Sequence, residues 1–194
     1  MAIKDYERIV KGNMGDKRFT HCKNVSKEAA ALAKIYGADE EKAQLAGILH
    51  DATKEFSFER QLQIMHDGGI ILDEVESVST NLWHAISGSV YARDVLHIED
   101  WDVLNAIRYH TSGRKNMSLL EKIIYVADYT SAERCFDGVE HMRKCARKNL
   151  DEAILFGTAY TIADLAKHNR LVHPGAVALY NEVLLKKSSR KDKN

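Results

Sequence analysis

The residues best suited to chemistry in this chain are histidines and aspartates that fall on apolar helical stripes. In chain order they are His21, the pair His50-Asp51, His84, His110 and Asp128. Residues three, four and seven apart share one face of a helix, and each member of this set aligns with the apolar residues of its own segment. Buried imidazole and carboxylate groups need partners, because an unpaired buried charge is costly. A shared cation would satisfy the whole set, so the pattern predicts a buried metal site.

The ligand types narrow the choice of metal. Imidazole mixed with carboxylate suits iron, manganese, cobalt or zinc better than calcium, which prefers oxygen ligands alone. The three cysteines, Cys22, Cys135 and Cys145, lack the spacing of a zinc-binding set, which argues against a structural zinc site. A single inward histidine is more often a core residue bonded to backbone, but the ordered set favours metal binding. The pattern does not decide between one ion and two.

Basic and hydroxyl side chains follow the predicted ligands within a few residues. They are Lys54, Thr111, Arg114 and Arg134. A cation one short turn beyond a metal ligand can reach an oxygen of a phosphate that the metal also binds. The alternative for Lys54 and Arg114 is a solvated surface charge. These positions are therefore candidates for binding a phosphorylated substrate.

The elements that must position these groups are helices. The chain has one proline and no long alternating segment of β-branched residues, so we expect an all-α fold. The predicted helices span 3–13, 16–36, 39–50, 57–67, 80–97, 100–110, 117–130, 138–149, 150–168 and 174–187. A length of 194 residues with 45% hydrophobic content is enough for a single domain. We place that domain at 1–187 and a polar C-terminal tail at 188–194.

The overall charge is balanced, with 28 Lys and Arg residues against 28 Asp and Glu residues. Such a balance predicts neither nucleic acid nor an anionic membrane as a partner. No apolar stretch near the first residues resembles a signal peptide or a spanning helix, so we expect a cytoplasmic protein with reduced thiols. Whether the chain forms a homodimer is left open.

Several local motifs resemble one branch of a known family. They are Arg18-Phe19-Thr20-His21, Leu49-His50-Asp51-Ala52-Thr53-Lys54, His110-Thr111-Ser112-Gly113-Arg114, Ala127-Asp128-Tyr129 and His173-Pro174. The ordered set resembles the HD-domain metal-dependent phosphohydrolases, and within them the symmetrical diadenosine tetraphosphate hydrolases. The motifs run from residue 18 to residue 174, nearly the whole chain. The resemblance implies that the predicted helices form an HD-domain helical bundle.

The resemblance also implies roles for individual residues. An iron-type cation would be held by His21, His50, Asp51 and Asp128. His84 and His110 would either bind a second cation or contact phosphate. Asp51, which can orient the attacking water beside the metal, and Lys54 are the expected catalytic residues. The expected nucleotide-binding residues, with Thr111 and Arg114 included, are His21, Asp51, Lys54, His84, His110, Thr111, Arg114, Asp128, Arg134, Arg170, Leu171, Val172, His173 and Pro174.

The implied reaction is symmetrical hydrolysis of a dinucleoside polyphosphate. Diadenosine tetraphosphate would be cut between its two middle phosphates, with two molecules of ADP as the product. One alternative is another HD-type reaction, such as that of a nucleoside monophosphatase or a cyclic-nucleotide phosphodiesterase. A second alternative is a catalytically silent helical module that binds nucleotide, although an intact ligand set argues against it. The preferred nucleoside is left open.

Overall fold

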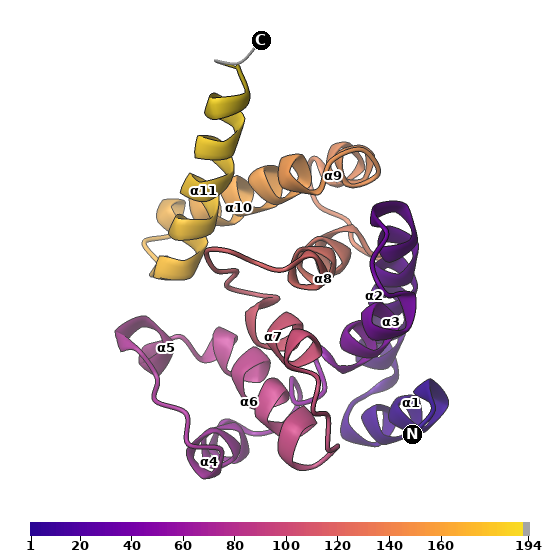
Figure 1. Ribbon diagram of the computed structural model, residues 1–194. Helices are drawn as coiled ribbons and strands as arrows, with labels where there is room; N and C mark the ends of the chain where they lie inside the picture. The colour runs from indigo at the N-terminus through magenta and orange to yellow at the C-terminus, as the bar shows by residue number, and fades with distance from the viewer. Residues whose placement is uncertain (192–194) are drawn as a thin grey trace.

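The computed structural model describes residues 1–191, which form eleven α-helices and, within that range, no β-strand. The helices are α1 (Ile3–Asn13), α2 (Asp16–Tyr36), α3 (Glu40–Leu49), α4 (Phe58–Asp67), α5 (Glu74–Val78), α6 (Thr80–Asp94), α7 (Trp101–Tyr109), α8 (Leu119–Thr130), α9 (Val139–Ala146), α10 (Leu150–Lys167) and α11 (Pro174–Lys191). Figure 1 shows their arrangement as a bundle. The predicted all-α fold is confirmed.

The predicted helices match the observed ones except at several ends and at one short element. Helix α6 ends at Asp94 rather than at 97, because His97 takes a left-handed backbone conformation with φ of 56°. The short helix α5 was not predicted; Asp73 caps it by accepting hydrogen bonds from two backbone N–H groups. Helix α11 continues to Lys191, beyond the predicted start of the tail at 188. Residues 192–194 lie outside the described part, and the domain boundary at 187 stays a prediction.

Helix α8 lies at the centre of the bundle and packs against α2, α3, α7, α9 and α10 (Figure 1). Its residues Ile123, Ile124 and Val126 are fully buried, so apolar contacts hold the helix on several sides. Ser118 begins the helix with a capping box that pairs it with Glu121. This packing brings Asp128, in the last turn of α8, to the interior of the bundle.

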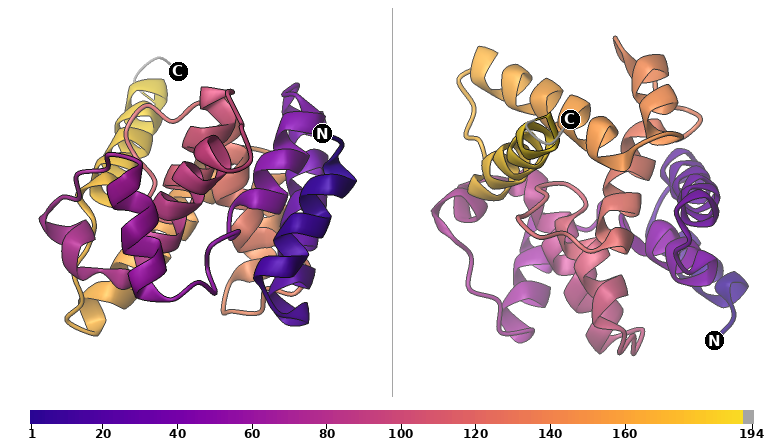
Figure 2. Two further views of the ribbon diagram at one scale, coloured as in Figure 1. Left: turned by 90° about the horizontal axis from the view of Figure 1, so that it is seen from below. Right: turned by 45° about the horizontal axis from the view of Figure 1, so that its top comes forward.

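Helices α2 and α3 lie side by side, and a glycine permits their close approach (Figures 1 and 2). A Cβ atom added at Gly47 would lie only 2.7 Å from the Cα atom of Ser26, closer than such atoms approach in proteins. Glycine is therefore needed where the two backbones meet. The contact sets the spacing between His21 on α2 and His50 at the end of α3.

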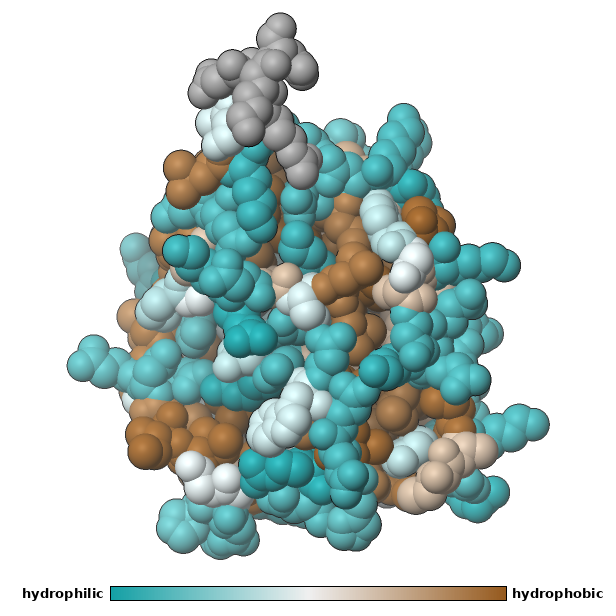
Figure 3. All heavy atoms as spheres, in the orientation of Figure 1, coloured by the Kyte–Doolittle hydropathy of each residue, from teal (hydrophilic) through white to brown (hydrophobic). Residues whose placement is uncertain are grey.

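The face of the molecule in Figure 3 is largely hydrophilic, with hydrophobic residues scattered over it. Across residues 1–191, no helix combines the length and the apolar character that crossing a bilayer requires. A cytoplasmic location, the lack of nucleic-acid and membrane partners, and the oligomeric state stay predictions.

Candidate metal centre and substrate cleft

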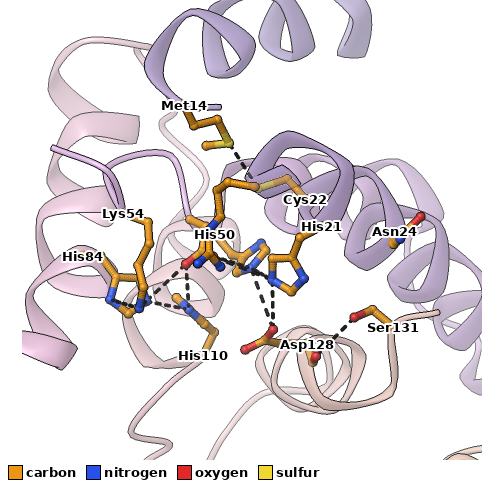
Figure 4. A network of polar contacts seen from close by, with 12 residues as sticks. Met14, His21, Cys22, Asn24, His50, Lys54, His84, His110, Asp128 and Ser131 are labelled. Atoms are coloured by element: carbon orange, nitrogen blue, oxygen red, sulfur yellow. Dashed lines mark hydrogen bonds and ion pairs between the residues drawn. The ribbon is translucent and has the colours of Figure 1, made fainter. Parts of the chain in front are cut away.

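All six predicted ligand residues meet at one place inside the bundle. Figure 4 labels five of them there, namely His21, His50, His84, His110 and Asp128. They belong to α2, α6 and α8 and to the residues that directly follow α3 and α7. The four histidines and Asp51 are each at most 6% exposed, and the Asp128 side chain is 16% exposed. Segments far apart in the chain therefore supply one buried, polar cluster.

Asp51 lies between two pairs of histidines. Its Oδ2 atom is 3.6 Å from the Nε2 atoms of both His21 and His50. Its Oδ1 atom is 3.2 Å from Nε2 of His84 and 3.8 Å from Nε2 of His110. One carboxylate thus faces a different pair of imidazoles with each of its oxygens.

Asp128 joins the first pair. Its Oδ1 atom lies 3.2 Å from Nε2 of His21 and 4.0 Å from Nε2 of His50. The two Nε2 atoms are themselves 3.1 Å apart. Two imidazole nitrogens and oxygens from two carboxylates therefore surround one point; we call His21, His50, Asp51 and Asp128 the first ligand group.

The backbone orients two of the histidines in the same way. His50 directly follows α3, and its Nδ1 atom donates a hydrogen bond of 2.7 Å to the carbonyl oxygen of Gly47. His110 directly follows α7, and its Nδ1 atom donates to the carbonyl oxygen of Ile107 at 2.8 Å. Each bond fixes the proton on Nδ1 and leaves an Nε2 lone pair directed at the cluster, the usual arrangement of a histidine that binds a metal.

A carboxylate that was not predicted orients His21. The Nδ1 atom of His21 donates to Oε1 of Glu133, which also accepts from the Ser131 hydroxyl at 2.8 Å. The other oxygen of Glu133 accepts from the Asn24 amide at 2.6 Å. Carboxylate groups behind a metal-binding histidine raise its basicity and fix its ring. Glu133 was not predicted because it lies 112 positions from His21 in the sequence, and spacing within one helix cannot indicate such a contact.

The first ligand group fits a bound cation. His21 and His50 use their Nδ1 protons on outer partners, so their Nε2 lone pairs face each other and two carboxylate oxygens. Acceptor atoms this close need a cation or a proton between them, because lone pairs repel. Two nitrogens and carboxylate oxygens are the donors that iron, manganese, cobalt and zinc accept. The part of the chain that the structure describes therefore holds a metal-type donor set.

The surroundings also set the protonation states that metal binding needs. Burial lowers the pKa of His110 to about 4, with a further contribution from the neighbouring His50. Burial likewise lowers the pKa of His50 and of His84. For Asp128, burial opposes ionisation, but the adjacent His21 imidazole and the charge of Arg134 hold its pKa well below the usual range. The pKa of His21 is lowered by burial but raised overall by Asp128 and Glu133, so a proton on its Nε2 atom would take the place of a cation there. At neutral pH His50, His84 and His110 are neutral and Asp128 is ionised, as metal ligands must be.

His84 differs from the other three histidines. The ammonium group of Lys54 lies 3.0 Å from its Nδ1 atom, and an ammonium can only donate. The proton of His84 is then on Nε2, from which it can donate to Asp51 Oδ1 or to the Thr111 hydroxyl, 3.3 Å away. In this tautomer His84 is a hydrogen-bond donor directed into the cluster, where His110 Nε2 also lies 3.2 Å from it. The Lys54 ammonium is 3.3 Å from His84 Nε2 as well, so its positive charge lies beside the second candidate metal group, Asp51, His84 and His110.

Each aspartate also contacts an arginine. Arg18, which was not assigned a role from the sequence, donates from Nη1 to Asp51 Oδ2 at 2.8 Å. Arg134 donates from Nη2 to Asp128 Oδ1 and from Nε to the Asp128 carbonyl oxygen at 2.7 Å. Both arginine side chains are about one-third exposed, at 32% and 39%. They compensate the buried carboxylates and remain accessible from outside.

The cluster opens into a cleft of about 790 Å³, within the range of roughly 300–1,000 Å³ typical of ligand pockets. Four basic residues line it, namely Lys17, Arg18, Lys54 and Arg134. Its other lining residues include the predicted Thr111 and three aromatic residues, Tyr129, Phe136 and Tyr160. The cleft thus combines a metal-type centre, positive charge and aromatic surface.

The structure does not bring every predicted nucleotide-binding residue to this cleft. Arg114 pairs with the buried Glu121 at 2.7 and 3.1 Å and lies over the Tyr109 ring, so its charge is already compensated elsewhere. The predicted loop, residues 170–174, is also absent from the lining. Its His173 lies 3.4 Å from Asp73 Oδ2 instead. A nucleotide-binding role for Arg114, Arg170, Leu171, Val172, His173 and Pro174 stays a prediction that this arrangement does not support.

Comparison with known proteins identifies the class. The family model described as "HD domain" matches residues 18–133, and the chain therefore belongs to the HD-domain family. Within that family it is similar to two proteins named symmetrical bis(5'-nucleosyl)-tetraphosphatase. The one from Halalkalibacterium halodurans is 42% identical, covering 92% of this chain and 95% of the relative. The one from Bacillus subtilis is 39% identical, covering 89% and 92%.

A solved structure gives the same answer for the fold. It is a predicted HD superfamily hydrolase involved in NAD metabolism from Clostridium acetobutylicum, with a TM-score of 0.92 and 36% identity. The alignment covers 96% of this chain and 98% of that one. The chain is thus an HD-domain hydrolase, and the predicted helical bundle and family are confirmed.

Proposed function

We propose that this protein hydrolyses diadenosine tetraphosphate symmetrically to two molecules of ADP. The observation that carries the proposal is that His21, His50, Asp51 and Asp128, whose donor atoms lie 3.1 to 4.0 Å apart in the measured pairs, open into a cleft lined by four basic residues. A phosphate chain needs both, because its charge must be neutralised while a water is activated beside it. The relatives named symmetrical tetraphosphatases support this choice of substrate and cleavage position.

We propose iron as the metal, held by His21, His50, Asp51 and Asp128, with manganese, cobalt and zinc as alternatives. The nitrogen and oxygen donors support this group of metals. When bound, such an ion lowers the pKa of a coordinated water to about 7 and so provides hydroxide at neutral pH. We propose one resident ion, because the Lys54 ammonium, 3.0 Å from Nδ1 and 3.3 Å from Nε2 of His84, opposes a second cation beside that histidine.

The residues around the metal would have separate tasks. Asp51 Oδ1 faces away from the first ligand group and accepts a hydrogen bond that orients the attacking water. Lys54, Arg134 and Arg18 neutralise the phosphate oxygens, and His84 donates from Nε2 to one of them. Charge-assisted bonds of this kind strengthen as negative charge develops in phosphoryl transfer.

Product analysis tests the proposal. Purified protein loaded with iron(II) is incubated with diadenosine tetraphosphate, and the nucleotides are separated by ion-exchange chromatography. We expect ADP as the product, no turnover in excess chelator, and close to one metal equivalent by elemental analysis. Formation of ATP with AMP, or release of inorganic phosphate from mononucleotides without cleavage of the dinucleotide, would contradict the proposed reaction. Two firmly bound equivalents would contradict the single-ion assignment alone.

A further inference from the structure

One side of the cleft carries aromatic rings that neither the metal centre nor the phosphate contacts use. Tyr129 lies in the last turns of α8, Phe136 in the segment that follows, and Tyr160 on α10. The ring centroids of Phe136 and Tyr160 are 5.0 Å apart at an interplanar angle of 41°, and those of Tyr129 and Phe136 are 6.3 Å apart. We call these three residues the aromatic wall.

The aromatic wall is not simply an edge of the hydrophobic core. Tyr129 and Phe136 pack against the core, but Tyr160 lies outside it and is 41% exposed. Phe136 packs against Tyr160, and the exposed part of Tyr160 lines the cleft. An exposed ring among charged lining residues suits a ligand with a flat, π-bonded part.

The segment that joins the metal centre to the aromatic wall is held in place by Arg143 of α9. Its guanidinium donates to the carbonyl oxygens of Thr130 at 3.1 Å, Ser131 at 2.8 Å and Arg134 at 2.9 Å. Arg134 and Phe136 are therefore presented on a braced backbone, two residues apart. One ligand could therefore place a phosphate at Arg134 and a flat ring of its own against Phe136 and Tyr160, on a surface that is already preorganised.

The remaining rim of the cleft has a different character. Lys17 and Arg18 come from the first turn of α2, and Glu55 from the turn after Asp51. In the described part of the chain, aromatic lining comes only from α8, the segment after it and α10. The aromatic lining therefore comes from the side of α8 and α10, beside Arg134, while α2 contributes Lys17 and Arg18.

We propose that the aromatic wall is a nucleobase-binding subsite and that the cleft recognises only one of the two nucleosides of its substrate. The inference rests on the proposed function and adds where and how the nucleoside binds. One base stacks on Tyr160 beside Arg134, while the other half of the substrate is held through its phosphates near Lys17 and Arg18. The second nucleoside contributes little to binding.

A substrate with a single nucleoside should then be accepted. Water would attack adenosine 5'-tetraphosphate between its second and third phosphorus atoms, breaking one P–O–P bond and giving ADP and pyrophosphate. The water oxygen enters one product and the bridging oxygen leaves with the other, so no further reactant is needed. We expect the KM values for this substrate and for diadenosine tetraphosphate to agree within about threefold.

Binding measurements separate the subsite from catalysis. Isothermal titration calorimetry would compare ADP with pyrophosphate, which lacks a base, on metal-loaded wild type, Tyr160→Ala and Tyr160→Trp. We expect Tyr160→Ala to weaken ADP binding about tenfold and to leave pyrophosphate binding unchanged, and Tyr160→Trp to restore ADP binding. The matched control is Trp101→Ala, which removes an aromatic ring that is 65% exposed at the opposite end of α7 from His110.

The outcomes distinguish this inference from the proposed function. Equal loss of ADP and pyrophosphate affinity in Tyr160→Ala, or no loss of either, would overturn the nucleobase subsite. A KM for adenosine 5'-tetraphosphate about a hundredfold above that for the dinucleotide would overturn recognition of a single nucleoside. If wild type cleaves neither compound but binds ADP in a Tyr160-dependent way, the proposed reaction fails while the subsite stands. Because Tyr160 is partly exposed, circular dichroism of the variant should match that of wild type.

Discussion

Replacement of Gly47 by alanine should damage the metal centre without touching a ligand. The added Cβ atom would lie 2.7 Å from Cα and 3.0 Å from the backbone nitrogen of Ser26. Backbone atoms cannot rotate away, so α2 and α3 must separate by about 0.7 Å to reach ordinary contact at 3.4 Å. Metal–ligand distances tolerate only about 0.2 Å, so His21 and His50 would no longer share one ion well.

The cost in stability follows from the same overlap. Overpacking of a tight contact typically destabilises by about 1–3 kcal/mol, and in a domain of this size 1 kcal/mol corresponds to roughly 2–4 °C in Tm. We therefore expect Gly47→Ala to remain folded, with a Tm lowered by several degrees and with a much reduced metal content and activity. Thermal melts by circular dichroism and elemental analysis measure the two effects separately.

Gly12→Ala is the matched control, because a Cβ at Gly12 in α1 meets no atom within 4 Å. That variant should keep the Tm, or raise it slightly because alanine favours helix, and keep its metal. If Gly47→Ala retained the metal content and Tm of Gly12→Ala, the close approach of α2 and α3 would not be what positions the two histidines.

Three further predictions concern charge. Asp128→Asn should lose the metal and nearly all activity, because the carboxylate charge offsets the cation; elemental analysis with an activity assay tests this. Lys54→Ala and Arg134→Ala should keep the metal but raise the KM for diadenosine tetraphosphate roughly tenfold or more, as expected for lost charge-assisted bonds; unchanged kinetics would refute the phosphate contacts. The metal-free protein should lose stability on acidification from pH 6.5 towards pH 4. His110 has a folded pKa of about 4 against an ordinary 6.5, so the unfolded chain binds more protons at this residue in that window, which corresponds to about 3 kcal/mol. The raised pKa of His21 offsets part of this loss. Chemical unfolding across this pH range measures the loss, and a flat profile would contradict the neutral, buried state of His110.

The helices and the meeting of the six candidate ligands in one cluster could be predicted from the sequence because both have local signatures. The periodic spacing of apolar residues predicts each helix, with its ends placed to within a few residues. A polar residue at one of these inward positions is easily recognised as a candidate ligand. His50 and His110 show this well, since each directly follows a helix whose inward face it continues. Helix α5 escaped prediction because five residues are too few to show a period, although Asp73 and Glu76 form a capping box.

The contacts behind the ligands could not be predicted in the same way. Glu133 contacts His21, which is 112 positions away in the sequence, and Arg18 contacts Asp51, 33 positions away. Such contacts depend on how the helices pack. Arg114 illustrates the same limit. Its position after His110 indicated a phosphate contact, but Glu121 one helix later takes its charge. Sequence proximity to a ligand therefore predicts the turn on which a residue lies but not the partner it finds.

The two arginines of the centre connect metal binding to substrate binding. Arg18 bonds Asp51 Oδ2 and Arg134 bonds Asp128 Oδ1, the same oxygens that face His21 and His50. A carboxylate oxygen shared with a cation attracts a guanidinium less strongly, because the cation's charge opposes the arginine's. Metal binding would therefore release donors of both arginines toward the cleft, where a phosphate chain can accept them. By linkage, a bound phosphate chain must then strengthen metal binding by the same factor. The arginines that stabilise the buried carboxylates without a metal are in this way available for substrate once the metal is bound.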